Sequence, residues 1–228
     1  MREHTITVNR PTRAMRFQDR YDGGRQLAAK LDAYRGEKVL VLGLPRGGVE
    51  VAYEVARALN APLDVVVARK IGAPFQPELG VGAIAEDGLP VFDEATLRAL
   101  RLSLEDLAPV IAREREELRR RVQQYRQGRA APQVQDRTVL LVDDGLATGV
   151  TAHAALRALA RRQPRRLVLA VPVCAPDTVR KLREDADDVV CVICPRRFAA
   201  VGIWYEDFRQ TSDETVIELL ERARRTAA

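Results

Sequence analysis

One stretch of the sequence decides the fold that we predict: Val139-Leu140-Leu141-Val142-Asp143-Asp144-Gly145-Leu146-Ala147-Thr148-Gly149-Val150-Thr151. Four apolar residues that favour strands lead directly into two carboxylates, and a loop of glycine, threonine and small residues follows. A helix is expected to begin at about Val150. Such a strand is typical of a parallel sheet buried on both faces, and open α/β sheets bind ligands at the carboxyl ends of their strands.

Each part of this stretch has a chemical use. The backbone N–H groups of residues 145–151 can surround a phosphate at the helix N-terminus, and Thr148 and Thr151 add hydroxyl donors. Asp143 and Asp144 lie one short step from that anion, so they suit sugar hydroxyls better than the phosphate itself. A ligand with a phosphate next to a diol is a phosphorylated ribose.

Other interpretations of the same residues fit less well. Paired acids after an apolar strand also occur in receiver domains, but there they end the first strand of a short domain, whereas here they lie past residue 140. A purely structural turn would not need two adjacent acids beside four glycine or threonine positions. The phosphate-loop pattern G-x-x-x-x-G-K-[ST] does not occur in the sequence.

The stretch resembles the phosphoribosyl pyrophosphate (PRPP) motif of the type I phosphoribosyltransferases, and every part of that motif is present. The resemblance implies that Asp143 and Asp144 bind the ribose hydroxyls and hold Mg²⁺ through its water shell. It also implies that a loop holds the 5′-phosphate, namely Gly145, Leu146, Ala147, Thr148, Gly149, Val150 and Thr151. The chain most resembles a group of bacterial chains described only as predicted phosphoribosyltransferases, whose substrate is not settled.

Length and composition favour one soluble α/β domain over residues 1–228, with 46% apolar and 30% charged residues. The net charge of +5 favours polyanionic substrates and tolerates incidental nucleic-acid binding. No apolar run reaches the ~18 residues of a membrane span, and the N-terminus lacks an apolar signal core. The protein is therefore expected in the cytoplasm, without a membrane partner.

Strands alternating with helices predict a doubly wound, mainly parallel sheet, with a core over residues 36–200. A strand at 38–44, a helix at 49–59 and a strand at 63–68 form the first βαβ unit. Residues 72–88 contain four glycines and two prolines and therefore predict a loop with at most short strands. Further helices are expected at 26–34, 94–127, 150–162, 177–185 and 213–224, the last capped by Asp213, and residues 1–16 are interpreted as an arm or an edge strand.

A second loop could hold a pyrophosphate group. Residues 43–48 follow the first strand of the sheet, and Gly47 and Gly48 let backbone N–H groups approach an anion. Arg46 brings a guanidinium fork suited to phosphate oxygens. The resemblance identifies Pro45, Arg46, Gly47 and Gly48 with the family's pyrophosphate loop.

The resemblance also suggests further parts of the site. It assigns a basic residue at the end of the next strand to the pyrophosphate, with Lys70 preferred over Arg69, and it puts a flexible catalytic loop at residues 72–88. Lys70 and Arg46 join Asp143 and Asp144 as the expected catalytic groups. The helices at 94–129 look like the insert of the bacterial group.

A hood over the base would come from residues 17–24 and 195–208, with Phe198, Trp204 and Tyr205 as stacking candidates. The hood loosely resembles that of 6-oxopurine enzymes. Ala147, however, stands where those enzymes carry an aspartate and where adenine- and orotate-type members carry alanine. The base therefore stays open, with a purine-type base preferred, and the aromatic residues could equally belong to the core.

The C-x-x-C formed by Cys191 and Cys194 invites a zinc or redox interpretation, but it lies in an apolar strand and no second C-x-x-C exists, so buried structural cysteines are expected.

The resemblance implies a Mg²⁺-dependent transfer of phosphoribosyl from PRPP to a base, as in nucleotide salvage. The alternative is a non-catalytic PRPP or nucleotide sensor that binds nucleic acid through the basic helix at 113–129. A transferase with an unusual acceptor also stays open. A homodimer is expected by analogy and from the apolar stripe between Leu104 and Tyr125, which can equally be an intramolecular face.

Overall fold

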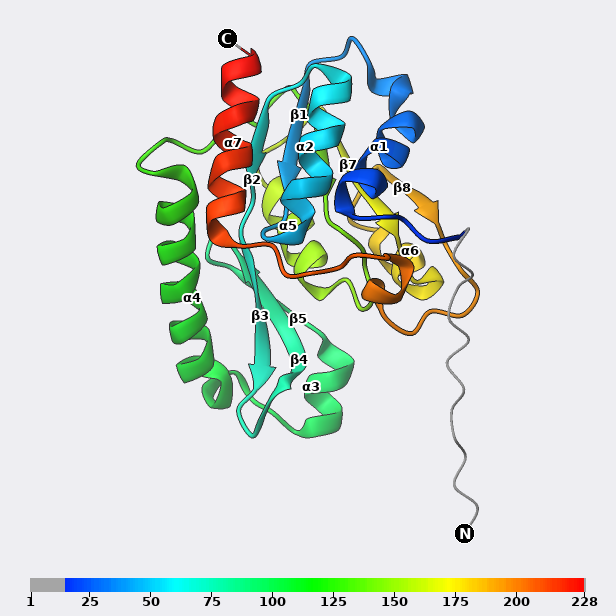
Figure 1. Cartoon of the computed structure of the whole chain (residues 1–228). Coiled ribbons are helices and arrows are strands. Elements are labelled where there is room, and N and C mark those ends of the chain that lie inside the picture. Colours follow the sequence, from blue (N-terminus) through cyan, green and yellow to red (C-terminus); the bar gives the residue numbers. More distant parts are fainter. Residues whose placement is uncertain (1–14, 228) are drawn as a thin grey trace.

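The computed structural model describes residues 15–227, and its centre is a five-stranded parallel sheet (Figure 1). The strands follow the order β2-β1-β6-β7-β8. Their bounds are β1 Val39–Gly43, β2 Leu63–Val65, β6 Thr138–Val142, β7 Arg166–Val173 and β8 Asp188–Ile193. The predicted doubly wound, mainly parallel α/β fold is confirmed. The arm or edge strand expected at residues 1–16 lies almost wholly outside the described residues.

Helices cover both faces of the sheet because successive residues of each strand point to opposite sides. Val41 and Leu140 pack toward α1 (Arg20–Lys30), α2 (Gly47–Leu59) and α7 (Asp213–Ala227). Leu42 and Leu141, each one position further along, pack toward α5 (Val150–Ala160) and α6 (Pro176–Leu182). The strands are therefore apolar at nearly every position, as the sequence of β6 predicted.

The strand order places a topological switch between β1 and β6. From β1 the chain moves to β2 on one side, and the later strands continue on the other side of β1. Ligands of open α/β sheets bind in the crevice outside the carboxyl ends of the strands at such a point. The two loops singled out in the sequence follow these two strands.

The predicted loop at residues 72–88 is wrong, because most of it forms a second sheet. This antiparallel sheet consists of β3 (Ala68–Ala73), β4 (Gln76–Ala85) and β5 (Pro90–Phe92). Glycine lets its strands approach closely: a Cβ on Gly72 would lie 2.1 Å from the Pro77 carbonyl oxygen. The glycines that predicted a loop therefore allow a tight hairpin, and β4 is longer than the short strands that the sequence allowed.

The strand predicted at 63–68 is also too long. After Val65 the chain leaves the main sheet, because side chains satisfy the backbone groups that a continuing strand would use. Arg126 donates from Nη2 to the Val65 carbonyl over 2.8 Å, and Glu86 accepts from the Val67 N–H over 2.8 Å. The chain then turns into β3.

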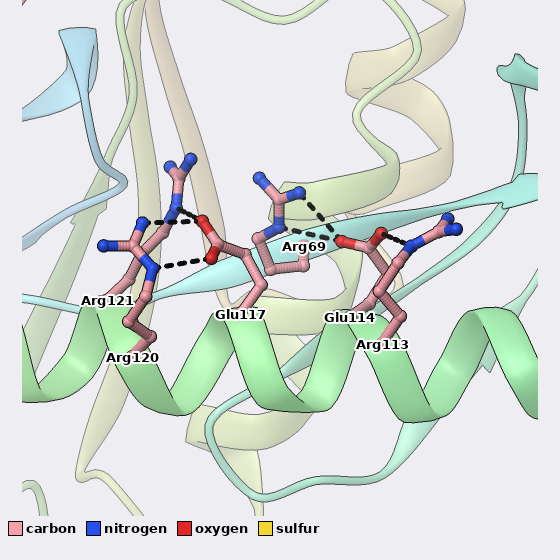
Figure 2. A network of polar contacts seen from close by, with 6 residues as sticks. All are labelled: Arg69, Arg113, Glu114, Glu117, Arg120 and Arg121. Atoms are coloured by element: carbon pink, nitrogen blue, oxygen red, sulfur yellow. Dashed lines mark hydrogen bonds and ion pairs between the residues drawn. The ribbon is translucent and has the colours of Figure 1, made fainter.

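Two helices, α3 (Glu94–Leu100) and α4 (Leu104–Arg126), follow the hairpin, as the sequence suggested. The apolar stripe of α4 faces its own molecule, since Leu107, Ile111, Leu118 and Tyr125 are at most 8% exposed. Figure 2 shows Arg69 of β3 reaching Glu114 of α4, with 2.9 Å between Nε and Oε2. The stripe is therefore an intramolecular face, which removes the periodicity argument for a homodimer.

Smaller corrections concern helix ends. The predicted helix at 26–34 begins earlier, at Arg20, because Asp19 caps it by accepting the Asp22 N–H over 2.7 Å, and a short 3₁₀ helix covers Asp32–Tyr34. Ser212, not Asp213, caps α7 by accepting the Thr215 N–H over 3.1 Å, while Asp213 accepts a hydrogen bond from Tyr125.

The expectation that Cys191 and Cys194 are buried is wrong for Cys194 and holds only in part for Cys191, whereas Cys174 is buried. Cys191 is half-buried on β8, which is the edge strand of the sheet among the described residues, and Cys194 is exposed just after that strand ends. Among the described residues, no three His, Cys, Asp or Glu side chains gather as a metal site. Between residues 15 and 227 no helix has the length and hydropathy to cross a membrane. The cytoplasmic location stays a prediction.

Candidate functional site

Asp143 and Asp144 lie directly beyond the carboxyl end of β6, at the switch point of the sheet. The Asp144 N–H donates to Oδ1 of Asp143 over 2.8 Å, which fixes the first carboxylate against its own backbone. Oδ2 of Asp144 accepts from Nε of Arg20 over 2.8 Å. Both carboxylates are thus held in place before a ligand arrives.

Burial is the main influence on the protonation of this pair. It raises the pKa of Asp143 well above its ordinary value, and the neighbouring Asp144 carboxylate raises it further. Burial also raises the pKa of Asp144, while the Arg20 guanidinium opposes that rise. Arg20 is therefore the cation that favours the charged form of both acids.

The loop after the acid pair leads into helix α5. Gly149 has a φ of +71° and precedes the first helical residue, Val150, and no side chain caps the helix. The first N–H groups of a helix have no intrahelical partner, so they are available to an anion. A Cβ on Gly149 would lie 2.6 Å from Cγ2 of Thr178, so α6 supports the loop from behind.

The rest of this loop is anchored to its neighbours while its tip faces solvent. The Leu146 N–H donates to the Val173 carbonyl over 2.9 Å, and the Ala175 N–H donates to the Leu146 carbonyl over 3.0 Å. Ala147 and Thr148 are exposed. The loop therefore combines a fixed base with accessible N–H and hydroxyl groups, as a phosphate site requires.

The predicted pyrophosphate loop meets the acid pair directly. A Cβ on Gly47 would lie 2.1 Å from Oδ2 of Asp144, and one on Gly48 would lie 2.9 Å from the Cα of Asp143. Only glycine fits at these positions. The peptide bond between Pro45 and Arg46 is cis, and Arg46 precedes the first residue of α2. Within the described chain Arg46 forms no ion pair, so its guanidinium remains available.

Lys70 does not lie where its assignment assumed. It stands inside β3 of the hairpin rather than at the end of a main-sheet strand, and its Nζ lies 3.4 Å from Oε2 of Glu78. Arg69, the second choice, is paired with Glu114 of α4. The reason is the early departure of the chain from the main sheet after Val65. The assignment of Lys70 to pyrophosphate stays a prediction.

The two segments predicted to form the hood are hydrogen-bonded to each other. The Phe17 N–H donates to the Trp204 carbonyl over 2.8 Å, and the Glu206 N–H donates to the Phe17 carbonyl over 2.8 Å. Trp204 and Tyr205 are only 4% and 2% exposed, and Tyr205 donates its hydroxyl to the Asp144 carbonyl. Phe198 is half-buried. Of the three stacking candidates, only Phe198 has an accessible ring.

Arg20 is the residue of the site that sequence reasoning missed. It opens α1, is 7% exposed, and reaches Asp144 across 124 positions of the chain. Asp19 and Asp22 signal a helix start around it. The resemblance places residues 17–24 in the hood over the base, but no residue pattern links Arg20 to the acid pair, so its contact with Asp144 is visible only in three dimensions.

The parallel sheet, the glycine-bearing loops after β1 and β6, and the acid pair between them define an α/β protein whose ligand crevice lies at its switch point. The comparison with known proteins identifies the family. A family model described as the phosphoribosyl transferase domain matches residues 16–206. The chain therefore belongs to the phosphoribosyl transferase family.

Similar proteins agree with this assignment. A provisionally named phosphoribosyl transferase, matched in two strains of Mycobacterium tuberculosis, is 47% identical over 212 residues, which cover 93% of this chain and 48% of the relative. The solved structure of the protein TT1426 from Thermus thermophilus is 45% identical and superposes with a TM-score of 0.78, covering 91% of this chain and 99% of the other. The chain thus spans about half the length of the curated relatives that it matches.

Proposed function

We propose that the chain transfers the 5-phosphoribosyl group of PRPP to a nitrogenous base. In this reaction the bond between C1′ and the pyrophosphate oxygen breaks and a bond from C1′ to a base nitrogen forms. Pyrophosphate leaves with the electron pair of the broken bond, and the base nitrogen gives up its proton. The observation that carries the proposal is the direct contact between the pyrophosphate loop and the acid pair at Gly47 and Asp144.

The roles follow from the positions of the groups. Asp143 and Asp144 accept hydrogen bonds from the ribose hydroxyls, and residues 145–151 hold the 5′-phosphate at the N-terminus of α5. Arg46, Gly47 and Gly48 stabilise the leaving pyrophosphate, and the resemblance assigns Lys70 to the same group. Catalysis then rests on positioning and charge stabilisation, because no nucleophile is needed.

Magnesium fits the donors that are present. Two adjacent carboxylates and the phosphate oxygens of the substrate are the kind of set that Mg²⁺ prefers, since it usually keeps several of its own waters. Asp143 and Asp144 would hold the ion through that water shell. When bound, it neutralises charge on the pyrophosphate group.

The acceptor is proposed to be a purine-type base beneath the paired segments at residues 17–18 and 204–207. Phe198 offers a ring for stacking there. The indole N–H of Trp204 is buried and has no hydrogen-bond partner among the described residues. This N–H is enclosed by the protein, so it is not assigned to the base, and the stacking role stays with Phe198.

The alternative of a sensor that binds nucleic acid gains little support from α4. Its arginines are engaged within the molecule. Arg120 and Arg121 both pair with Glu117 (Figure 2). Arg115 donates to the Gly88 carbonyl, and Arg126 is 5% exposed. A phosphate backbone would have to compete with these contacts. The catalytic proposal is therefore preferred.

The test is pyrophosphate release from PRPP and Mg²⁺ in the presence of a panel of purine and pyrimidine bases. The proposal expects release with at least one base, and Asp144→Asn should abolish most of it while leaving the fold intact. Release by Asp144→Asn at the wild-type rate would contradict the assigned site. Binding of PRPP without release for any base would favour the regulatory alternative.

A further inference from the structure

We propose that Arg20 is a positioning residue for PRPP: it holds the Asp144 carboxylate in its binding orientation and ties it to the segment formed by residues 205–211. This inference rests on the proposed function. Arg20 lies outside both ligand-binding loops, within the segment 17–24 that the resemblance assigns only to the hood over the base.

The guanidinium of Arg20 makes contacts in three directions. Its Nε donates to Oδ2 of Asp144 over 2.8 Å, and its Nη1 donates to the Arg209 carbonyl over 2.6 Å. Its flat face lies on the Phe208 ring, 4.0 Å from the ring centroid. A planar fork with several donors can make all of these contacts at once, whereas a lysine ammonium cannot.

The surroundings make this arrangement rigid. Arg20 is 7% exposed, and the side chain of Asp144 is 17% exposed. The Tyr205 hydroxyl donates to the Asp144 carbonyl, and the Tyr205 ring stacks on Phe208 at 5.0 Å. Asp144 is therefore held through its carboxylate by Arg20 and through its backbone by Tyr205, which belongs to the segment that Arg20 also contacts.

The pair also touches the pyrophosphate loop. A Cβ on Gly47 would lie 2.5 Å from Nε of Arg20 and 2.1 Å from Oδ2 of Asp144. A ligand bound to both loops would therefore contact the Asp144 carboxylate, whose Oδ2 already accepts a hydrogen bond from Arg20. Arg20 leaves Oδ1 of Asp144 for the ribose and sets the direction in which it points.

The test is a double-mutant cycle read by calorimetric titration of PRPP with Mg²⁺. We expect Arg20→Gln to weaken PRPP binding about tenfold in the wild-type background. In the Asp144→Asn background, Arg20→Gln should lower PRPP affinity by less than about threefold, because the carboxylate that Arg20 positions has already been replaced. Arg20→Lys, which keeps the charge and one contact, should give an intermediate affinity.

Two controls separate positioning from a loss of structure. Arg25→Gln removes an arginine of the same helix that is half-exposed and pairs with Asp22 over 3.7 Å, so it should leave the affinity unchanged. Phe208→Leu loosens the same segment but keeps the ion pair, and it should weaken PRPP binding less than Arg20→Gln does. Thermal melting of every variant confirms that each one folds.

The outcomes are distinct. An Arg20→Gln effect that is equally large with and without Asp144 would identify a purely structural residue and overturn the inference. Wild-type affinity in Arg20→Gln would overturn it as well, with the proposed function intact. Absence of PRPP binding by the wild type would overturn the proposed function, and this inference with it.

Discussion

At the scale of single residues, Asp143 is expected to favour ligand binding and to lower the stability of the fold. The chain buries its carboxylate beside a second acid, so the pKa of Asp143 lies well above its ordinary value. A raised folded-state pKa means that the folded chain binds the proton more tightly than the unfolded chain does. Asp143 therefore costs stability once the pH rises above its unfolded pKa, and that cost is absent in acid.

Asp143→Asn should consequently stabilise the chain while weakening PRPP binding. The asparagine Oδ1 can still accept the Asp144 N–H, but no charge is buried. We expect a gain in the free energy of unfolding at neutral pH, because the folded wild type must hold a buried charge there that asparagine lacks. Urea unfolding at several pH values measures it. A gain that persists below about pH 3.5, where the wild-type carboxyl is protonated in both states, would contradict this explanation.

Gly47 is the residue that allows the pyrophosphate loop and the acid pair to touch. Gly47→Ala would bring a methyl group to 2.1 Å from Oδ2 of Asp144, so the loop or the carboxylate must move. We expect PRPP affinity to fall at least about tenfold, because in the proposed site the loop and the carboxylate bind the same ligand. Calorimetric titration measures the change.

Gly36→Ala is the matched control. Gly36 has a φ of +85° and nothing within 4 Å of an added Cβ, so this change strains the backbone far from the ligand loops. It should lower stability and leave PRPP affinity unchanged. Equal losses of affinity in both variants would mean that general destabilisation, not the local clash, weakens binding.

At the scale of elements, Arg126 fastens α4 and the hairpin to the main sheet. Its Nη1 lies 2.7 Å from Oε2 of Glu86, and its side chain is 6% exposed. Arg126→Met would leave the Glu86 carboxylate and the Val65 carbonyl without this donor. We expect a loss of ~3 kcal/mol in the free energy of unfolding, typical of breaking one side of a buried pair.

Urea unfolding tests this prediction against Arg119→Met on the same helix. The side chain of Arg119 is 73% exposed and lies 3.6 Å from Glu116, so its removal should change stability by less than about 0.5 kcal/mol. Similar results for the two variants would show that Arg126 contributes no more than a surface ion pair.

The elements also show which parts of the structure local sequence determines. β6 and the loop after it were predictable, because four consecutive apolar residues, two acids and a glycine each have a narrow range of uses. The hairpin β3–β4 was not, because its glycines signal a loop unless the partner strand is known. The same limit explains Lys70, whose position follows from contacts of Val65 and Val67 with residues distant in the sequence.

At the scale of the whole molecule, a net charge of +5 suggests affinity for polyanions, but the arginines of α4 are largely paired. We expect binding to a generic single-stranded RNA to be weak, to disappear by about 0.2 M salt, and to be unaffected by PRPP. Fluorescence anisotropy of a labelled RNA at several salt concentrations measures this. Tight RNA binding that PRPP strengthens or releases would instead support the sensor.

The arrangement of the whole chain brings the site together from four distant regions. The switch point of the sheet joins the loop after β1 to the loop after β6, while α1 and residues 205–211 enclose the acid pair through Arg20 and Tyr205. The motifs of the first two regions were readable in the sequence. The contacts of Arg20 and Tyr205 with Asp144 depend on packing between α1 and residues 205–211, and no local sequence pattern predicts these contacts.

The central claim is that Asp143 and Asp144 form a PRPP site, and calorimetric titration of PRPP with Mg²⁺ tests it most directly. The wild type should bind with a Kd in the micromolar range, about −8 kcal/mol, and the double variant Asp143→Asn/Asp144→Asn should lose that binding while melting as a folded protein. Equal binding by both proteins, or none by the wild type, would contradict the claim.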